Sequence, residues 1–576
     1  MIRLTSCLKG YTLDQDKAVS PAKTLSQVRA SLARLEFDIL AHTRRIDAGR
    51  LDIPVYLSVC GNDARHCMPT RKQMGKGATP QQAEASALME LVERFSFFTF
   101  WQSMPGMTEA AWDEAERLWG DALMPMEEIL LSVHDPLPPD KARQILNLLP
   151  WRFFPATCLT TGLECRLPLD WFKRLGEFNG SSAGNTQEES LLQGVCELVE
   201  RHVCALIDTQ RPTTPTIDAS DCEDPVLQRL TAVFAREGIR LILKDFSLDM
   251  PVPTVAALAW DPATFPERSE LVFTAGTAAS PVKAAIRAIT EVAQLAGDFC
   301  TGACYEASGL PKFLQLEETA WLLQGPSMSL RDMPSVDAVD IRDELTSLTA
   351  GLAARHFRVY SITTTHPDLS IPAHYSMVPG FAFRERDANQ SLGLFVGRML
   401  VEDREAEHAA HGLAVLDTLY PQAHFIPFFK GLLELRLGVL NKARAFFQQA
   451  YLVQPDAGSR SLTAFYAAYT HTQAAEWRQA LPFLELALND APDMKEYWNL
   501  RGVAHFKLKD YGPAARDFEA ALRIDKGSAL DLANLGLCYK FMGNRHDAAH
   551  CLRNALELDP DLGFAREHLK ELKQTL

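Results

Sequence analysis

The last third of the chain repeats its apolar, small and proline positions every 34 residues. Gly502 and Gly536 are 34 residues apart, and so are Ala514 and Ala548. A helical hairpin with this period cannot bury its apolar face alone, so successive hairpins must stack on one another. The pattern therefore predicts four stacked hairpins and an amphipathic capping helix, with hairpins near residues 421–457, 458–493, 494–527 and 528–561.

Three stretches in the first two thirds of the chain combine apolar helical periodicity with a polar stripe. In each stretch the polar residues stand at offsets of 0, +4 and +7, which share one helix face because successive residues turn by about 100°. Three separated helices thus present matching polar faces. The stripes are Ser86, Glu90 and Glu93; Gln193, Glu197 and Glu200; and Arg287, Glu291 and Gln294.

Composition narrows the choice of partners. The chain has 576 residues, with 58 Lys and Arg against 73 Asp and Glu, so its net charge of −15 opposes nucleic acid and anionic membranes. Apolar residues make up 47% and charged residues 23%, which is typical of a globular protein with several domains. We find no membrane-spanning apolar window and no signal peptide, and we read the twelve cysteines as reduced, mostly buried thiols, so we expect a cytoplasmic protein.

The three polar stripes predict chemistry when they are taken together. Alone, Glu90 and Glu93 are explained more simply by a solvated helix face that pairs with Arg94. Carboxylates that converge from three helices need cations, and Mg²⁺ that bridges them to phosphate oxygens predicts a nucleoside triphosphate. The loop Gly180–Asn185, before the second helix, is a further candidate for phosphate contact. A metal-dependent hydrolase without ATP is disfavoured because no histidine accompanies these carboxylates.

Two family resemblances follow from these segments. GKGAT…ASALMELVERFS, NGSSAGNT…GVCELVERH and IRAITEVAQ resemble, in order and spacing, the three signature segments of the YcaO family. The resemblance extends over about residues 1–385, up to IPAHYSMVPGF, and implies an α/β (mixed) ATP-binding catalytic domain over residues 1–400. The repeats resemble the tetratricopeptide family and imply an all-α superhelix over residues 421–576, after a linker over residues 401–420.

The YcaO resemblance also assigns roles to individual residues. It implies that ATP and Mg²⁺ are cofactors, and that Glu90, Glu200 and Arg201 are catalytic. The Mg²⁺ ligands that it implies are Glu90, Glu93, Glu197 and Glu200. The residues that would surround the nucleotide are Lys9, Ser86, Asn185, Glu189, Arg201, Arg287, Glu291 and Gln294.

The activity that the resemblance implies is ATP-dependent activation of a peptide backbone amide. A nucleophile adds to the carbonyl, the resulting oxyanion attacks the γ-phosphoryl group of ATP, and phosphate then leaves. Members that form azolines usually end in a proline-rich tail, whereas this chain ends in ELKQTL. The tetratricopeptide extension resembles the architecture of methylthiolation accessory proteins, which favours an accessory role in ribosomal-protein methylthiolation on a peptide or protein substrate. Thioamide formation stays open, because KGYT…SPAKTL is also similar to the opening segment of thioamide-forming members.

Alternatives from a different class remain open. The repeats could bind a protein partner in their concave groove, or act as a rigid spacer or dimer contact, and the family resemblance is compatible with a homodimer. The whole chain could also be a non-catalytic ATP-binding scaffold that acts through its tetratricopeptide groove. His546 and His550 stand one helical turn apart, but a solvated helix face explains them better than a metal site.

Overall fold

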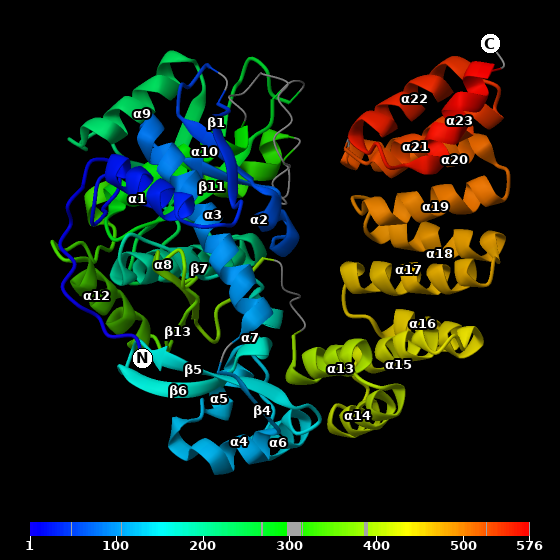
Figure 1. Ribbon diagram of the computed structural model, residues 1–576, viewed down its shortest axis with the longest axis horizontal. Helices are drawn as coiled ribbons and strands as arrows, with labels where there is room; N and C mark the ends of the chain where they lie inside the picture. The colour runs from blue at the N-terminus through cyan, green and yellow to red at the C-terminus, as the bar shows by residue number, and fades with distance from the viewer. Residues whose placement is uncertain are drawn as a thin grey trace. The chain divides into compact units, whose positions relative to one another are not determined.

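The computed structural model describes residues 1–47, 49–104, 106–266, 269–296, 313, 315–384, 390–525 and 527–574. They divide into two compact units (Figure 1). Met1–Pro139 with Pro150–Gln390 form the first unit, and Asp140–Leu149 with Ser391–Leu576 form the second. The first is mixed α/β and the second is helical, so the predicted fold class is confirmed.

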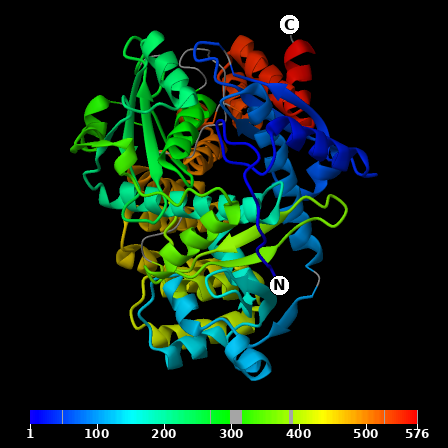
Figure 2. The same cartoon turned by 90° about the vertical axis from the view of Figure 1, so that its left-hand side faces the viewer.

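The described strands of the first unit form three sheets, which Figure 2 shows as separate groups of strands. The smallest sheet is antiparallel and contains β1 (Leu40–Arg45), β2 (Val55–Cys60) and β3 (Lys72–Lys76) in that order. Helix α3 (Pro80–Ser103) packs against this sheet and against α1 (Pro21–Ala33). The apolar side of α3 is buried there, so its other side is available for a site.

The second sheet has the order β11-β10-β9-β8-β12 in the described chain. Its β10 residues are almost all buried, because helix α10 (Pro281–Ala296) covers β10 and β11, and α9 (Pro225–Arg236) packs on α10 and β9. The strands are β8 (Thr216–Asp218), β9 (Arg240–Asp245), β10 (Thr254–Trp260), β11 (Val272–Thr277) and β12 (Ser327–Ser329).

The third sheet has the order β4-β5-β13-β14-β7, with β6 paired to β5. Helix α8 (Gln187–Gln210) contacts β7 and β14 of this sheet and β11 of the second sheet, so it joins the two. Helix α12 (Ile341–Ala353) packs on α8. The strands are β4 (Thr108–Ala110), β5 (Trp151–Cys158), β6 (Leu163–Pro168), β7 (Ser181–Ala183), β13 (Tyr360–Thr363) and β14 (Ala373–Met377).

The remaining short helices that the structure describes before residue 390 connect these elements along the chain, and all but one of them belong to the first unit; the exception is α6, which belongs to the second unit apart from its first residue. The chain starts beside the third sheet, where the Ile2 amide donates a hydrogen bond to Thr157 Oγ1 on β5. The short helices are α2 (Asn62–Cys67), α4 (Trp112–Trp119), α5 (Met126–Leu131), α6 (Pro139–Leu146), α7 (Leu169–Gly176) and α11 (Ala320–Leu323).

The second unit contains the four predicted hairpins and the capping helix. A small residue on the first helix of a hairpin meets a large residue on the second: a Cβ on Gly502 would lie 2.9 Å from the Phe518 ring, and one on Gly536 would lie 2.9 Å from Leu552. This close approach explains why a small residue recurs at this position of the repeat. The helices are α15 (Phe425–Arg436), α16 (Leu440–Val453), α17 (Ala457–Gln473), α18 (Trp477–Asp490), α19 (Lys495–Lys507), α20 (Tyr511–Ile524), α21 (Ala529–Phe541), α22 (Arg545–Leu558) and α23 (Gly563–Gln574).

Residues 401–420, for which we predicted a linker, are mostly helical. They belong to α13 (Leu392–Asp403) and α14 (Ala406–Leu419), which pack on each other and on α15. Gly397 of α13 leaves room for the Phe429 ring of α15, since a Cβ there would lie 2.8 Å from that ring. The pair thus extends the helical stack towards the N-terminus without following the 34-residue pattern.

The structure also shows the state of the cysteines and the lengths of the apolar helices. The ten described cysteines are free thiols and most of them are buried, while Cys300 and Cys304 lie outside the described residues. Within the described chain, every helix is too short or too polar to span a lipid bilayer.

Candidate functional site

Each polar stripe belongs to a module in which a strand runs directly into a capped helix. The modules are β3–α3, β7–α8 and β11–α10. A hydroxyl accepts a hydrogen bond from a first-turn amide in all three, at 3.2 Å for Thr79 and Thr186 and 3.4 Å for Ser280. Such a cap gives a partner to an amide that would otherwise lack one, and it therefore fixes the residue at which the helix begins. The three helices begin at the same point of the chain relative to the strands that precede them.

Small residues allow each strand to pack closely against the helix that follows it. A Cβ on Gly75 would lie 2.0 Å from the Ala87 amide nitrogen, and one on Gly276 would lie 2.5 Å from the Ala288 amide nitrogen. In the third module a Cβ on Gly194 would lie 2.7 Å from Ser182 Oγ.

In each of these three contacts, the residue on the helix comes twelve positions after the residue on the strand. Positions 15 and 18 after the strand residue then carry Glu90 and Glu93, Glu197 and Glu200, or Glu291 and Gln294. The shared spacing of the three stripes therefore follows from a shared strand–helix packing.

The three helix faces and the segment before α1 enclose an open cavity of about 290 Å³. Eleven of the twelve residues that the resemblance assigns to the site line this cavity, and only Lys9 does not. The eleven are Ser86, Glu90, Glu93, Asn185, Glu189, Glu197, Glu200, Arg201, Arg287, Glu291 and Gln294. The lining also includes Lys17, Lys76 and Arg94, to which the sequence assigned no firm role.

Helix α3 supplies two glutamates that share one arginine. Arg94 Nη1 lies 3.3 Å from Glu93 Oε1, and Arg94 Nη2 lies 3.7 Å from Glu90 Oε1. The Arg94 guanidinium also stacks over the Phe178 ring, 4.1 Å from its centroid. Burial raises the pKa of Glu90 and raises that of Glu93 to about 8, because one arginine only partly offsets burial and neighbouring carboxylates.

Helix α8 supplies the second pair of glutamates. Arg201 Nε donates a hydrogen bond of 2.9 Å to Glu197 Oε1, one turn earlier on the same helix. Glu200 Oε2 accepts a hydrogen bond of 2.8 Å from the Thr277 amide at the end of β11. Burial raises the pKa of Glu200, although Arg287 and Lys76 lower it. The charge of Glu200 is therefore held in place but incompletely neutralised.

Helix α10 links the other two modules. Arg287 Nη1 donates a hydrogen bond of 2.9 Å to Gln193 Oε1 on α8, and the buried Arg287 Nε has no hydrogen-bond partner among the described residues. Glu291 forms an ion pair with Lys76 at the end of β3. A buried guanidinium nitrogen without a partner is costly, so this wall of the cavity is suited to an anion.

The chain before α1 closes one side of the cavity and is attached through two predicted site residues. Glu189 Oε2 accepts a hydrogen bond from the Ala18 amide at 3.0 Å, and Lys17 Nζ lies 3.6 Å from Glu189 Oε1. Asn185 Nδ2 donates to Glu189 Oε1 at 2.9 Å, while Asn185 Oδ1 accepts from Thr24 Oγ1 at 2.9 Å. Asn185 and Glu189 thus hold the wall of the cavity as well as lining it.

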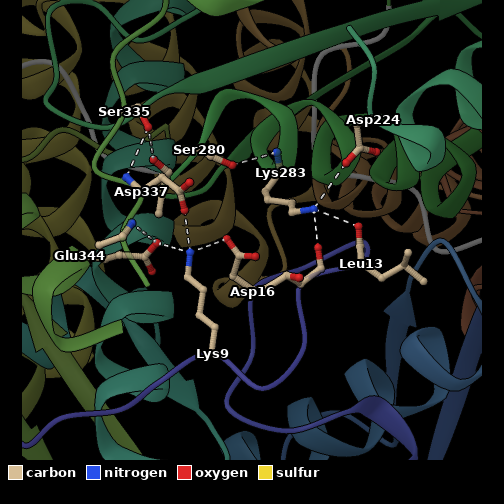
Figure 3. A network of polar contacts seen from close by, with 12 residues as sticks. Lys9, Leu13, Asp16, Asp224, Ser280, Lys283, Ser335, Asp337 and Glu344 are labelled. Carbon is tan, nitrogen blue, oxygen red and sulfur yellow. Dashed lines mark hydrogen bonds and ion pairs between the residues drawn. The ribbon is translucent and has the colours of Figure 1, made fainter. Parts of the chain in front are cut away.

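Lys9 lies outside the lining, contrary to its predicted place at the nucleotide. Its ammonium is buried among three carboxylates, 2.9 Å from Asp16, 2.6 Å from Asp337 and 2.6 Å from Glu344 (Figure 3). Burial alone would favour the neutral amine, but these three partners outweigh it and raise the pKa of Lys9. Lys9 therefore attaches the N-terminal segment to the start of α12.

The Gly180–Asn185 segment also differs from the expected phosphate loop. Residues 181–183 form β7, whose backbone pairs with β14, and the Gly184 amide donates to the Pro372 carbonyl oxygen at 3.0 Å. These backbone groups are already used in the sheet. Of this segment, Ala183 and Asn185 line the cavity.

The donor set of the cavity fits a divalent cation held together with an anion. The lining contains six glutamates and five basic side chains. Among the described residues, only Asp16, Asp337 and Glu344 bring three metal-ligand atoms within 4.8 Å of one another, and Lys9 lies between them. The cavity glutamates are further apart, which suits Mg²⁺, since this ion usually takes one or two carboxylates, waters and phosphate oxygens.

Comparison with known families places both units. The family described as YcaO cyclodehydratase, ATP- and Mg²⁺-binding, matches residues 74–382, which is more than half of the chain. Tetratricopeptide repeats match residues 495–528 and 532–562, the third and fourth hairpins.

Individual relatives cover parts of the chain. An uncharacterised protein of Methanothermobacter thermautotrophicus is 28% identical over 307 residues, which are 48% of this chain and 70% of that protein. The ribosomal protein S12 methylthiotransferase accessory factor of Escherichia coli is 30% identical over 219 residues, 33% of this chain and 35% of its own.

A heterocyclase solved in complex with substrate and cofactor superimposes with a TM-score of 0.54 at 22% identity. The match covers 66% of this chain and about half (54%) of the heterocyclase. This likeness supports the fold of the first unit, and the cavity lies within the matched family region except for the part of its lining that precedes residue 74.

Proposed function

The chain belongs to the YcaO family, whose description is ATP- and Mg²⁺-binding, and from this premise we propose that its first unit is an enzyme that activates a peptide backbone amide with Mg–ATP. The observation that carries the proposal is the convergence of α3, α8 and α10 on one cavity with six glutamates and five basic side chains. Bound Mg–ATP would supply the phosphoryl group, and the products would be ADP, phosphate and a modified amide.

The glutamates of α3 and α8 are the proposed metal ligands. Glu90, Glu93 and Glu200 each have a raised pKa because burial disfavours the charged form. A divalent cation would compensate for this cost and keep the carboxylates ionised. We assign Mg²⁺ to Glu90, Glu93, Glu197 and Glu200, directly or through water.

The basic residues on the same cavity are the proposed anion-binding groups. Arg287 has a buried Nε without a hydrogen-bond partner in the described chain, and Arg201 lies one turn from Glu197. Phosphoryl transfer depends mainly on positioning and on neutralising developing charge, so fixed arginines and metal-holding glutamates suffice without a nucleophilic Ser or Cys. Ser86, Asn185, Glu189, Glu291 and Gln294 complete the proposed nucleotide site.

The pathway in which the enzyme acts is a further part of the proposal. The similarity to the Escherichia coli accessory factor supports an accessory role in methylthiolation of a ribosomal protein. Thioamide formation on a peptide is the alternative product class. In either case we propose that the repeats of the second unit bind a protein partner or the substrate protein.

The direct test is Mg²⁺-dependent formation of ADP from ATP by the full chain, with and without candidate peptides. We expect Glu90→Gln to abolish turnover, because Gln keeps the shape of the side chain but removes a metal-ligand charge. Glu84→Gln is the matched control, since Glu84 lies on the same helix, pairs with Arg29 and is absent from the cavity lining.

Equal turnover in Glu90→Gln and wild type would refute the site assignment. A chain that binds partners through the second unit without any effect of ATP would instead support the scaffold alternative.

A further inference from the structure

Lys76 occupies a distinctive place among the three modules. It directly follows Gly75 at the end of β3, and the equivalent positions after Ser182 and Gly276 carry Ala183 and Thr277. Lys76 and Ala183 line the cavity, and the Thr277 amide contacts the lining residue Glu200. Of these three equivalent positions, only the one in the first module carries a cation. Gly75 has no room for a Cβ against Ala87, which fixes the place of the Lys76 backbone.

The partner of Lys76 comes from another module. Arg94 pairs with Glu90 and Glu93 on its own helix, and Arg201 pairs with Glu197 on its own helix. Lys76, on β3, instead pairs with Glu291 on α10. Its ion pair therefore joins two modules, and both partners line the cavity.

Lys76 also interacts electrostatically with the proposed metal ligands. Burial and then Arg287 lower the pKa of Lys76 to about 8, while Glu200, Glu90 and Glu197 act in the opposite direction. The ammonium is thus a counter-charge for three of the four proposed metal ligands and for Glu291, with which it pairs inside the same cavity. A second cation that enters this cluster alone must compete with the ammonium, because like charges a few ångströms apart repel strongly in a partly buried site.

We propose that Lys76 is a positioning residue that acts as the resident counter-ion of the glutamate cluster, so that free divalent cations bind poorly and metal binding depends on the nucleotide. The inference rests on the proposed function and adds a reason for ordered loading. The negative charge of a bound triphosphate would offset the repulsion between Lys76 and the metal, so that the cavity could accommodate both cations together. A purely structural Lys76–Glu291 pair would not link metal affinity to this lysine.

The test measures binding of Mn²⁺, a paramagnetic substitute for Mg²⁺, to the full chain without nucleotide by electron paramagnetic resonance. We expect weak binding in wild type and in Lys76→Arg, which keeps the charge. Lys76→Met should bind Mn²⁺ at least tenfold more tightly. Lys72→Met is the matched control, because Lys72 lies on the same strand but outside the cavity lining, and it should behave like wild type.

A Lys76→Met protein that binds Mn²⁺ no more tightly than wild type would overturn the inference. Lys76→Gln is measured in parallel and both variants are checked by thermal unfolding, so the result does not depend on one substitution. Calorimetry with a non-hydrolysable ATP analogue distinguishes a failure of the role of Lys76 from a failure of the proposed function. If wild type binds the analogue with Mg²⁺ but the variants show no gain for Mn²⁺ alone, only the role of Lys76 fails; if wild type binds no analogue, the proposed function fails as well.

Discussion

The Thr277 amide on β11 donates a hydrogen bond of 2.8 Å to Glu200 Oε2 on α8. This contact connects two of the three modules and orients a proposed metal ligand from a strand of another sheet. A glutamine at position 200 can still accept from the Thr277 amide, whereas it loses the negative charge. The contact therefore allows the charge of Glu200 to be tested without disturbing its position.

Glu200→Gln should retain the fold and lose the metal-dependent nucleotide affinity. Because burial raises the pKa of Glu200, removing its charge should leave the midpoint of thermal unfolding unchanged or raise it. Calorimetry and a thermal melt measure both effects. A lower melting temperature together with full Mg²⁺-dependent binding would contradict the assigned role.

Lys9→Met should lower the thermal stability directly and weaken nucleotide binding only as a consequence. The substitution leaves Asp16, Asp337 and Glu344 without their shared cation, and breaking a buried ion pair costs about 3–5 kcal/mol. We expect a lower melting temperature, and weaker nucleotide binding because the wall formed by Lys17 and Val19 is released.

The double variant Lys9→Met/Glu344→Gln is the control for this account. It removes one of the stranded carboxylates and should recover part of the lost stability. A Lys9→Met protein with an unchanged melting temperature and no nucleotide binding would show that Lys9 is a nucleotide ligand after all.

Gly75→Ala should disrupt the first module. The added Cβ would lie 2.0 Å from the Ala87 amide nitrogen, so β3 and α3 must separate. We expect a loss of about 2–4 kcal/mol in unfolding free energy, in the range of severe overpacking. Gly512→Ala is the control, because a Cβ there meets nothing within 4 Å and alanine favours a helix. Equal stability of both variants would argue against the packing that we describe.

Acid should destabilise the first unit through His202. This ring stacks on Phe381 with centroids 4.3 Å apart, and its Nδ1 accepts a hydrogen bond from the Ala382 amide at 2.9 Å. Burial lowers the pKa of His202 to about 4, so the unfolded chain takes up a proton first as the pH falls below about 6.5. The contribution of His202 to stability is then lost between about pH 6.5 and pH 4, and amounts to roughly 3 kcal/mol.

Thermal unfolding as a function of pH measures this effect. His202→Asn keeps an acceptor for the Ala382 amide but cannot be protonated, so its melting temperature should depend less on pH over this window. An identical pH dependence in the variant and in wild type would assign the acid sensitivity to other groups.

Much of the site could be predicted from the sequence because its information is local to each module. A strand residue such as Gly75, a capping hydroxyl such as Thr79 and the stripe from Ser86 to Glu93 are separated by fixed numbers of residues. The same local logic defines the hairpins, in which Gly502 meets Phe518.

The features that were missed depend on contacts between distant segments. The position of the Lys9 side chain depends on Asp337 and Glu344, which are more than 300 residues away in the chain. The short motif around Lys9 therefore could not predict these partners. The extended backbone of Ser181–Ala183 depends on pairing with β14, which comes almost 200 residues later. The ion pair between Lys76 and Glu291 is equally invisible along the chain.

The central claim is that the cavity between α3, α8 and α10 holds Mg–ATP. Calorimetric titration of the full chain with a non-hydrolysable ATP analogue, with and without Mg²⁺, tests it most directly when wild type is compared with Glu90→Gln/Glu200→Gln. The account predicts binding that requires Mg²⁺ and disappears in the double variant, while both proteins melt cooperatively. Absence of binding to folded wild-type protein, or equal binding by the double variant, would contradict it.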